Sequence, residues 1–161
     1  MWVKTVLVFL GAAALATSAV AQNKATGTAQ CKPDPPVPVE IGDKPGHFFA
    51  IGKAQCTWTG FEIAGVQYKD GVSVSQDEIH GDKSTSNGYH TATLANGDKT
   101  TAHFHGTAVT KDGKFVSGAG TWTFSSGTGK FKGINGKGTF KGTGNADGSA
   151  TYKVDGEYSL P

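Results

Sequence analysis

The sequence contains no arginine, and all fifteen of its basic residues are lysines. Arginine is the residue best suited to bidentate recognition of carboxylate or phosphate, so its absence disfavours a phosphorylated or strongly acidic ligand. The sequence also contains thirteen acidic residues, so its formal net charge is +2. This near balance gives no reason to expect a nucleic acid or an anionic membrane as a partner.

Helical periodicity is also missing after the first 21 residues. No stretch there repeats apolar residues at helical spacing for more than two turns, whereas short alternating runs bounded by glycine are frequent. The 24 glycines lack the three-residue period of collagen, and the aromatic residues are numerous enough to fill a core. The sequence therefore predicts an all-β globular domain.

The first 21 residues have the pattern of a cleaved signal peptide. A basic start that ends at Lys4 is followed by an apolar stretch over residues 6–15, which is too short to cross a bilayer. Ala19, Val20 and Ala21 form an A-x-A cleavage signal, so the mature chain is expected to begin at Gln22. We expect a secreted or periplasmic protein whose mature chain has no transmembrane segment.

The two cysteines, Cys31 and Cys56, are expected to form a disulfide, because an even pair in an exported chain is most simply bridged. Two free or metal-bound thiols are the alternative. Closing a loop of about 25 residues would stabilise the fold by roughly 3 to 4 kcal/mol. The bridge would tie a flexible, proline-rich leader over residues 22–45 to a β-barrel domain over residues 46–161.

Turn signals divide the rest of the chain into about eight short strands. Asp70-Gly71 predicts one hairpin turn. The clearest part is a three-strand meander over residues 89–95, 99–110 and 115–124, with turns at Asn96-Gly97 and Asp112-Gly113. Eight strands is the number at which a sheet closes around its own side chains or one small ligand. The predicted fold is a single closed antiparallel β-barrel of about eight strands.

A glycine-rich corner follows the meander and has the sequence Gly127-Thr128-Gly129-Lys130-Phe131-Lys132-Gly133, with Gly136 and Gly138 after it. It resembles a motif of the allene oxide cyclase and dirigent-type β-barrels, in which a GTG-x-F-x-G corner precedes a closing strand. Three earlier segments look like the small exported bacterial relatives of that superfamily: Asn96-Gly97-Asp98, Gly106-Thr107 and Gly120-Thr121-Trp122. The resemblance covers about residues 89–158.

This resemblance implies an eight-stranded barrel with an apolar-lined interior, often assembled as a trimer. The plant enzymes of the superfamily cyclise an unstable fatty-acid epoxide or steer the radical coupling of phenols. No residue here can be matched to a catalytic residue of either enzyme, and the missing arginine departs from dirigent-type pockets. The catalytic residues therefore stay unknown, since a fold does not carry a function by itself.

Two-residue turns in the meander would place His90 opposite His103, and His103 opposite Trp122. One face would then carry His90, Ala92, Leu94, His103, His105, Val109, Val116, Trp122 and Phe124. This face carries the larger number of apolar side chains, so we assign it to the interior of the barrel. The predicted ligand-binding residues are His90, His103, His105, Trp122 and Phe124. The opposite assignment, with Phe104 and Tyr89 in the core, stays open, because a bulge near Gly118 or Gly120 would turn the third strand over.

The leading functional hypothesis is an exported barrel that binds a small apolar molecule or acts as a non-catalytic interaction module, with homo-oligomers as an option. No cofactor and no metal belong to this hypothesis. One alternative is a cyclase- or isomerase-like enzyme, which needs little more than a shaped hydrophobic pocket. Another is periplasmic metal binding through His90, His103 and His105, since three imidazoles can form an open zinc site. The same histidines could equally be hydrogen-bonded or exposed strand residues.

Other polar residues are weaker candidates for a site. Asp77, Glu78, His80 and Asp82 lie together near a strand end, where they could include an acid–base pair, although a solvated strand end accounts for them as well. His47 has no visible partner and is expected to be a surface or packed histidine.

Overall fold

The structure, a computed structural model, describes residues 22–161. The predicted signal peptide and its cleavage site after Ala21 lie outside the described residues and stay predictions. The described chain forms ten strands and one 3-10 helix, with no α-helix among residues 22–161. These elements are β1 (Asn23–Pro33), β2 (Val37–Glu40), β3 (His47–Thr59), β4 (Glu62–Ile63), β5 (Val66–His80), β6 (Lys83–Leu94), β7 (Lys99–Lys111), β8 (Lys114–Gly127), η1 (Gly129–Phe131), β9 (Asn135–Gly144) and β10 (Ala150–Ser159).

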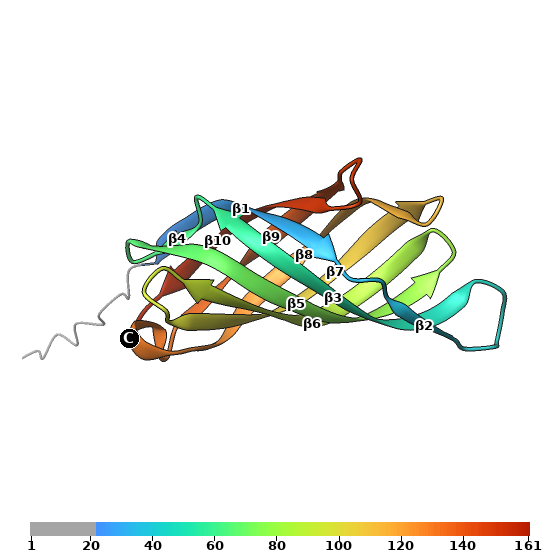
Figure 1. Ribbon diagram of the computed structural model, residues 1–161. Coiled ribbons are helices and arrows are strands. Elements are labelled where there is room, and N and C mark those ends of the chain that lie inside the picture. Colours follow the sequence, from blue (N-terminus) through green and yellow to red (C-terminus); the bar gives the residue numbers. More distant parts are fainter. Residues whose placement is uncertain (1–21) are drawn as a thin grey trace, which may run out of the picture.

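Eight of the strands close into an antiparallel barrel in the order β1-β10-β9-β8-β7-β6-β5-β3, and β3 pairs back onto β1 (Figure 1). Strand β2 pairs with the part of β3 that β1 does not cover, and β4 forms a small hairpin with the start of β5. The prediction of a closed barrel of about eight strands is confirmed.

The prediction of a flexible leader over residues 22–45 is wrong for its first half. Strand β1 belongs to the barrel and pairs with β10 on one side and β3 on the other. Buried Ala25, Ala29 and Cys31 alternate with polar residues, which is the period of a strand. These inward side chains are too small to stand out as a hydrophobic pattern, which explains the error. The barrel therefore begins at Asn23 and not at residue 46.

The predicted disulfide between Cys31 and Cys56 is confirmed. The two residues lie directly opposite each other in the β1–β3 pair, with Cα atoms 4.0 Å apart. Both cysteines are buried. The bridge joins two neighbouring strands of the barrel rather than a leader to a domain.

The β6–β7 turn has three residues instead of the predicted two. The N–H of Gly97 donates to the carbonyl of Leu94, and the N–H of Leu94 donates to the carbonyl of Asp98. Within the loop only Gly97 has a positive φ, of 86°. This is the three-residue hairpin that ends in a glycine bulge. It places Tyr89, and not His90, opposite His103.

The β7–β8 turn is the predicted two-residue turn, with positive φ at both Asp112 and Gly113. A register shift follows between Thr110 and Val109, where β8 contains the extra residue Val116. Because of this bulge Trp122 lies opposite Phe104, and not opposite His103. The bulge is at Val116, two residues before Gly118, whereas the sequence suggests one near Gly118 or Gly120.

The β6–β7 pairing and the β7–β8 pairing each differ by one residue from the predicted register. For β8 the two differences cancel, whereas the residues of β7 are turned to the opposite face. Trp122, Phe124, His90, Ala92 and Leu94 lie on the inner side, as predicted. The interior assignment is wrong for four residues, because His103, His105 and Val109 lie on the outer wall and Val116 is 44% exposed. Their place inside is taken by Ala102 and Phe104, which pack against the core.

The signal Asp70-Gly71 does not form a turn, because both residues lie within β5. The turn is at Ala64-Gly65, where both residues have positive φ, of 50° and 76°. Gly71 is needed for a different reason, since a Cβ at this position would stand 2.6 Å from the ring of His90. A glycine can thus mark the close approach of a side chain as well as a turn.

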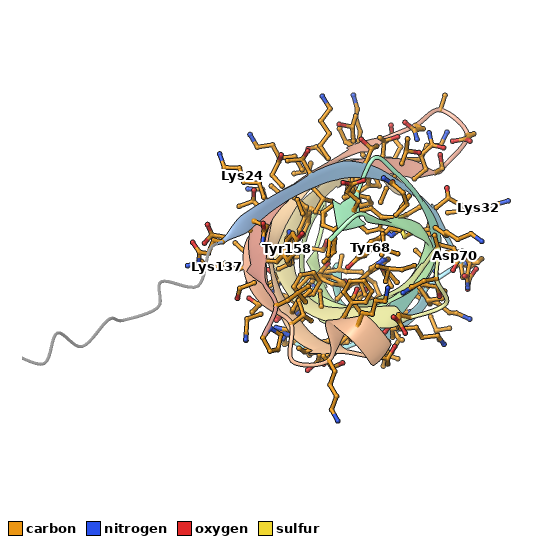
Figure 2. The ribbon with its side chains drawn as sticks, turned by 90° about the vertical axis from the view of Figure 1, so that its left-hand side faces the viewer. Lys24, Lys32, Tyr68, Asp70, Lys137 and Tyr158 are labelled. Carbon is orange, nitrogen blue, oxygen red and sulfur yellow. A yellow bond between two sulfur atoms is a disulfide. The ribbon has the colours of Figure 1, made fainter. Side chains whose placement is uncertain are left out.

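Aromatic rings in the interior lie over glycines of nearby strands. A Cβ at Gly88 would lie 2.8 Å from the ring of Phe104, and a Cβ at Gly106 would lie 2.8 Å from the ring of Phe140. Such pairing of a ring with a glycine fixes register and curvature in a closed sheet. Figure 2, a view along the barrel, shows Tyr68 and Tyr158 inside the ring of strands and Lys24 and Lys32 outside it.

Candidate functional site

Trp122 and Phe124 of β8 lie together inside the barrel. Their ring centroids are 4.9 Å apart, and Trp122 also meets Phe61 at 6.4 Å. The indole N–H of Trp122 is buried and has no acceptor among residues 22–161. A buried donor without an acceptor costs about 1–3 kcal/mol. This N–H is therefore an interior position that a bound water or ligand atom would satisfy.

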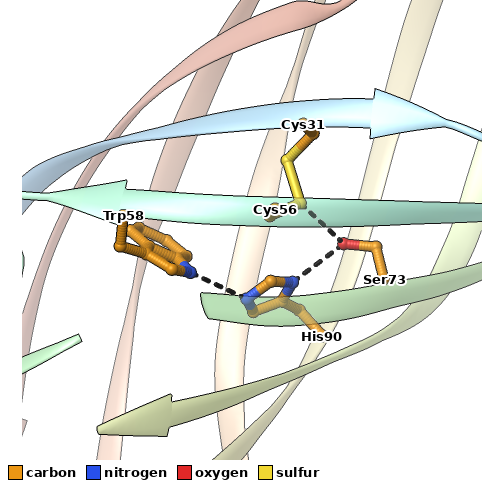
Figure 3. Close-up of a disulfide and its surroundings, with 5 residues drawn as sticks. All are labelled: Cys31, Cys56, Trp58, Ser73 and His90. Atoms are coloured by element: carbon orange, nitrogen blue, oxygen red, sulfur yellow. Dashed lines mark hydrogen bonds between the residues drawn. A yellow bond between two sulfur atoms is a disulfide. The ribbon is translucent and has the colours of Figure 1, made fainter. Parts of the chain in front are cut away.

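His90 of β6 also points into the barrel, where hydrogen bonds connect it to the surroundings of the disulfide (Figure 3). The indole N–H of Trp58 donates to His90 Nε2 at 3.1 Å, so the ring proton is on Nδ1, which donates to Ser73 Oγ at 2.8 Å. The Ser73 hydroxyl lies 3.9 Å from Cys56 Sγ. Burial lowers the pKa of His90 to about 4, so the imidazole is neutral at physiological pH. With both nitrogens engaged by protein partners, this histidine has a packing role.

His103 and His105 lie on the other side of the barrel wall. His103 Nε2 is 2.5 Å from the side-chain oxygen of Asn87, and its ring packs on Tyr89 with centroids 5.0 Å apart. His105 is exposed. Because His90 points inward and the other two histidines point outward, the three do not form the metal site of the alternative hypothesis.

Two hollows in the described part of the chain are open to solvent, and neither is lined by His90, Trp122 or Phe124. One, of about 360 Å³, lies at the end of the β5–β6 hairpin beside His80 and Lys83. The other, of about 210 Å³, lies against the β9–β10 pair beside Lys137 and Glu157. Neither coincides with the predicted ligand site.

Large apolar side chains gather on the outer wall of β2 and β3. Val37 lies opposite Ile51, and Val39 lies opposite Phe49. Their exposed fractions are 71% for Val37, 63% for Val39, 60% for Ile51 and 39% for Phe49. We call these four residues the β2–β3 patch. Single exposed apolar residues are normal, but a contiguous group on one wall is typical of an interaction surface.

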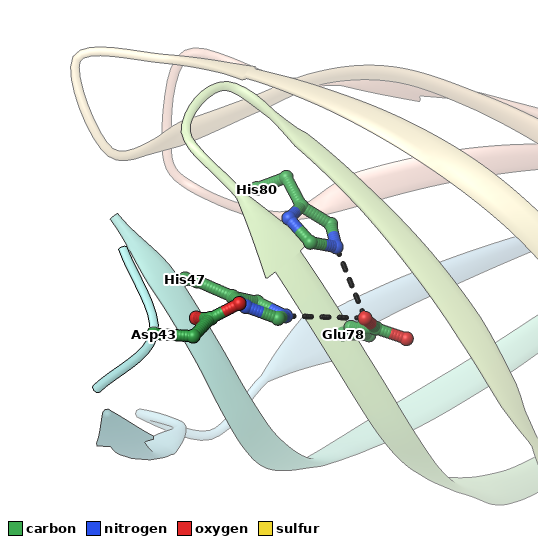
Figure 4. Close-up of polar contacts among 4 residues, drawn as sticks. All are labelled: Asp43, His47, Glu78 and His80. Atoms are coloured by element: carbon green, nitrogen blue, oxygen red, sulfur yellow. Dashed lines mark hydrogen bonds and ion pairs between the residues drawn. The ribbon is translucent and has the colours of Figure 1, made fainter. Parts of the chain in front are cut away.

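Four polar side chains meet at the adjoining ends of β3 and β5, and we call Asp43, His47, Glu78 and His80 the His47 cluster (Figure 4). His47 and His80 lie directly opposite each other, and their rings stack with centroids 4.0 Å apart. Glu78 Oε1 lies 3.1 Å from His47 Nε2 and 3.0 Å from His80 Nε2. Asp43, from the loop between β2 and β3, reaches His47 Nδ1 at 2.6 Å.

Hydrogen bonds from the histidines favour the ionised form of the two carboxylates in this cluster. The contact with His47 is the main reason that the pKa of Asp43 and the pKa of Glu78 lie below their usual values, and His80 lowers the pKa of Glu78 further. His47 is only 8% exposed, whereas the side chains of Glu78 and His80 are each 43% exposed. The cluster thus combines one buried imidazole with an accessible imidazole and carboxylate. This set of groups can hold a metal ion or transfer a proton.

The sequence does not reveal this cluster as a unit. Glu78 and His80 are two of the four neighbouring polar residues that could include an acid–base pair, but His47 has no partner nearby in the sequence. Strands β3 and β5 are not joined by a hairpin, because β4 and its turn lie between them. No turn signal therefore fixes their register, and only the tertiary fold brings His47 opposite His80.

The chain matches no model of a known protein family, and a search of curated proteins finds no match. The resemblance to the allene oxide cyclase and dirigent-type barrels therefore stays a prediction. Within the described part of the chain, no helix has the length and apolar character needed to cross a membrane.

Proposed function

We propose that this protein is an exported, non-catalytic β-barrel that acts through its outer wall as an interaction module and associates with further copies of itself. The observation that carries this proposal is the β2–β3 patch, where four large apolar side chains are exposed next to one another. Export is supported by the signal-peptide pattern of residues 1–21 and by the disulfide, since disulfides persist in oxidising compartments.

The packing of the interior supports a role for the outer wall. Aromatic rings such as Phe104 and Phe140 occupy the space over inward-facing glycines. At the end of the barrel where Asn23 pairs with Tyr158, three side chains are almost completely buried: Ile63, Leu94 and Phe131. An eight-stranded barrel can fill its interior with its own side chains, and it then offers its surface to other molecules.

Contact between copies would use the side chains of the patch and not the edge of the sheet. Strand β2 ends the strand order, so one of its edges has no partner within residues 22–161. Pro36 precedes this strand and Pro38 lies in it, and both lack a backbone N–H. Prolines at an edge hinder the pairing of a further strand.

A second copy of the chain is the partner that this surface fits. The patch consists of valine, isoleucine and phenylalanine and carries no charge, so it can bury the same patch of another copy around a two-fold axis. Assembly is also what the resemblance to the allene oxide cyclase and dirigent-type barrels implies.

Sedimentation equilibrium of the mature chain over a wide concentration range tests this proposal. We expect the wild type to form dimers or larger assemblies, and the double variant Phe49→Glu/Ile51→Glu to stay monomeric. Val116→Glu is the matched control, because Val116 is 44% exposed on β8, four strands away from β3 in either direction around the ring. A wild type that is monomeric at every concentration, or a double variant that assembles equally well, would contradict the proposal.

A second candidate function is the binding of a small, mostly apolar molecule inside the barrel. It is favoured by the buried indole N–H of Trp122, which has no acceptor within the described residues. Extraction of the purified native protein with organic solvent, followed by mass spectrometry, tests this candidate. A compound that is recovered from the wild type and lost in Trp122→Phe supports it, whereas an extract without any such compound speaks against it.

A further inference from the structure

We infer that the His47 cluster is a binding site for a divalent transition-metal ion of the zinc type. In this site His47 Nε2, His80 Nε2 and Glu78 Oε1 are the ligands, and Asp43 is a positioning residue. The site adjoins the β2–β3 patch, because Glu78 lies directly opposite Phe49, but none of its ligands belongs to the patch.

The spacing of the donor atoms fits such an ion. Two ligands at about 2.1 Å from a tetrahedral zinc ion stand about 3.4 Å apart. Glu78 Oε1 is 3.1 Å from one imidazole nitrogen and 3.0 Å from the other, and all donor atoms of the group lie within 4.8 Å of one another. Small side-chain rotations would therefore bring all three atoms into contact with one ion.

The backbone holds the ligands in place. His47 belongs to β3, and Glu78 and His80 belong to β5, so all three ligands come from one pair of hydrogen-bonded strands. The register places His80 opposite His47 and places Glu78 two residues before His80, on the same wall. A site built on paired strands is better ordered than one that is built on a loop.

Asp43 gives His47 the second interaction that is typical of metal-binding histidines. Its carboxylate accepts the Nδ1 proton at 2.6 Å, which turns Nε2 toward Glu78 (Figure 4). A carboxylate can only accept, so the contact between Nε2 and Glu78 needs a proton on that nitrogen. A metal ion would take the place of this proton, and the bond from Nδ1 to Asp43 would remain.

The donor set also indicates the class of metal. Two imidazole nitrogens with one carboxylate oxygen suit zinc, copper or nickel, whereas calcium and magnesium are bound through oxygen. The carboxylates of Asp43 and Glu78 would place two negative charges next to the ion. Three protein ligands leave a fourth position for water or a dissolved ligand, on the side where Glu78 and His80 are exposed.

Titration of the tag-free mature protein with Zn²⁺ by calorimetry tests this inference, with Co²⁺ absorption as a probe of the ligand geometry. We expect one ion per chain. We expect His80→Ala and Glu78→Gln each to weaken binding by at least about ten-fold, and Asp43→Asn to weaken it by about ten-fold. Asp43→Glu, which keeps the carboxylate, should recover part of that loss. A large excess of Ca²⁺ should not displace the bound ion.

His103→Ala is the matched control, because His103 is an outer-wall histidine outside the cluster. It should bind zinc like the wild type. His80 lies at the surface, so its variant is expected to fold, and near-UV circular dichroism checks that it does. A wild type without measurable zinc affinity would overturn the inference, and so would equal affinities in the wild type and the folded His80→Ala variant. A loss in His103→Ala as large as that in His80→Ala would overturn it too.

Discussion

Trp122 of β8 lies directly opposite Gly138 of β9, and a Cβ atom at Gly138 would stand 2.7 Å from the indole ring. The ring also lies over Gly156 of β10, the residue that pairs with Gly138. The indole is therefore held in a slot that two glycines form on neighbouring strands.

The substitution Gly138→Ala should press a methyl group against the backbone carbonyl of Asp155 and against the indole of Trp122. We expect a loss of about 1–3 kcal/mol in the free energy of unfolding, the usual cost of overpacking a core. Urea denaturation followed by tryptophan fluorescence measures both the stability and the environment of the ring. Thr139→Ala is the control, because Thr139 is the next residue of β9 and is exposed. Equal midpoints for Gly138→Ala and the wild type would show that the slot is not tight.

The hydroxyl groups of Tyr68 and Thr100 lie 2.5 Å apart in the core. Burial raises the pKa of Tyr68, so its hydroxyl keeps its proton. Tyr68→Phe leaves the hydroxyl of Thr100, which is only 2% exposed, without this partner. We expect a loss of about 1–3 kcal/mol in the free energy of unfolding. Tyr89→Phe, at a tyrosine that is 54% exposed, should change stability far less. A smaller loss for Tyr68→Phe than for Tyr89→Phe would contradict this reasoning.

His90 should make the stability of the barrel depend on pH. Its pKa in the folded protein is about 4, whereas histidine in an unfolded chain has a pKa of about 6.5. Between these values the unfolded chain binds a proton that the folded chain does not bind. The free energy of unfolding should therefore fall as the pH decreases from about 6.5 to about 4, by at most about 3 kcal/mol.

Urea denaturation at several pH values measures this effect. His90→Gln should lose the part of the pH dependence that His90 causes, whereas His105→Gln, at an exposed position of the outer wall, should keep it. Parallel curves of stability against pH for the wild type and His90→Gln would show that His90 is not the titrating group.

The disulfide between Cys31 and Cys56 closes a loop with a sequence separation of 25 residues. The double variant Cys31→Ala/Cys56→Ala should lose about 3 kcal/mol in the free energy of unfolding, because its unfolded chain is less restricted. The wild type in a reducing buffer should show a similar loss. A double variant as stable as the oxidised wild type would contradict the expectation.

The sequence is sufficient to predict the barrel, the disulfide and the turn at Asp112-Gly113. Alternation and turn residues are local signals, and they predict the class of fold well. The same signals could not predict the register. Asn96-Gly97 suits a two-residue or a three-residue hairpin, and the difference of one residue turns His103 and His105 to the other side of the wall.

Two features of the structure leave no local pattern. In β1 the inward residues Ala25 and Ala29 are small, so a strand of the barrel looks like a polar leader. The His47 cluster depends on a pairing between strands that no single turn connects. The prediction that Trp122 and Phe124 lie inside is correct only because the β6–β7 register and the β7–β8 register each differ from the predicted one by one residue, and the two differences cancel.

Strand β1 pairs along most of its length with β10, so Asn23 lies beside Tyr158 at the far end of the sequence. In an exported chain β1 emerges first and β10 emerges last, so the barrel cannot close until the whole chain has emerged. Cys56 arrives much earlier than β10, and its bond to Cys31 can hold the N-terminal strand at the open seam during that delay. If the chain is exported as we propose, oxidation of the two cysteines would then influence how quickly the barrel forms, and not only how stable it is afterwards.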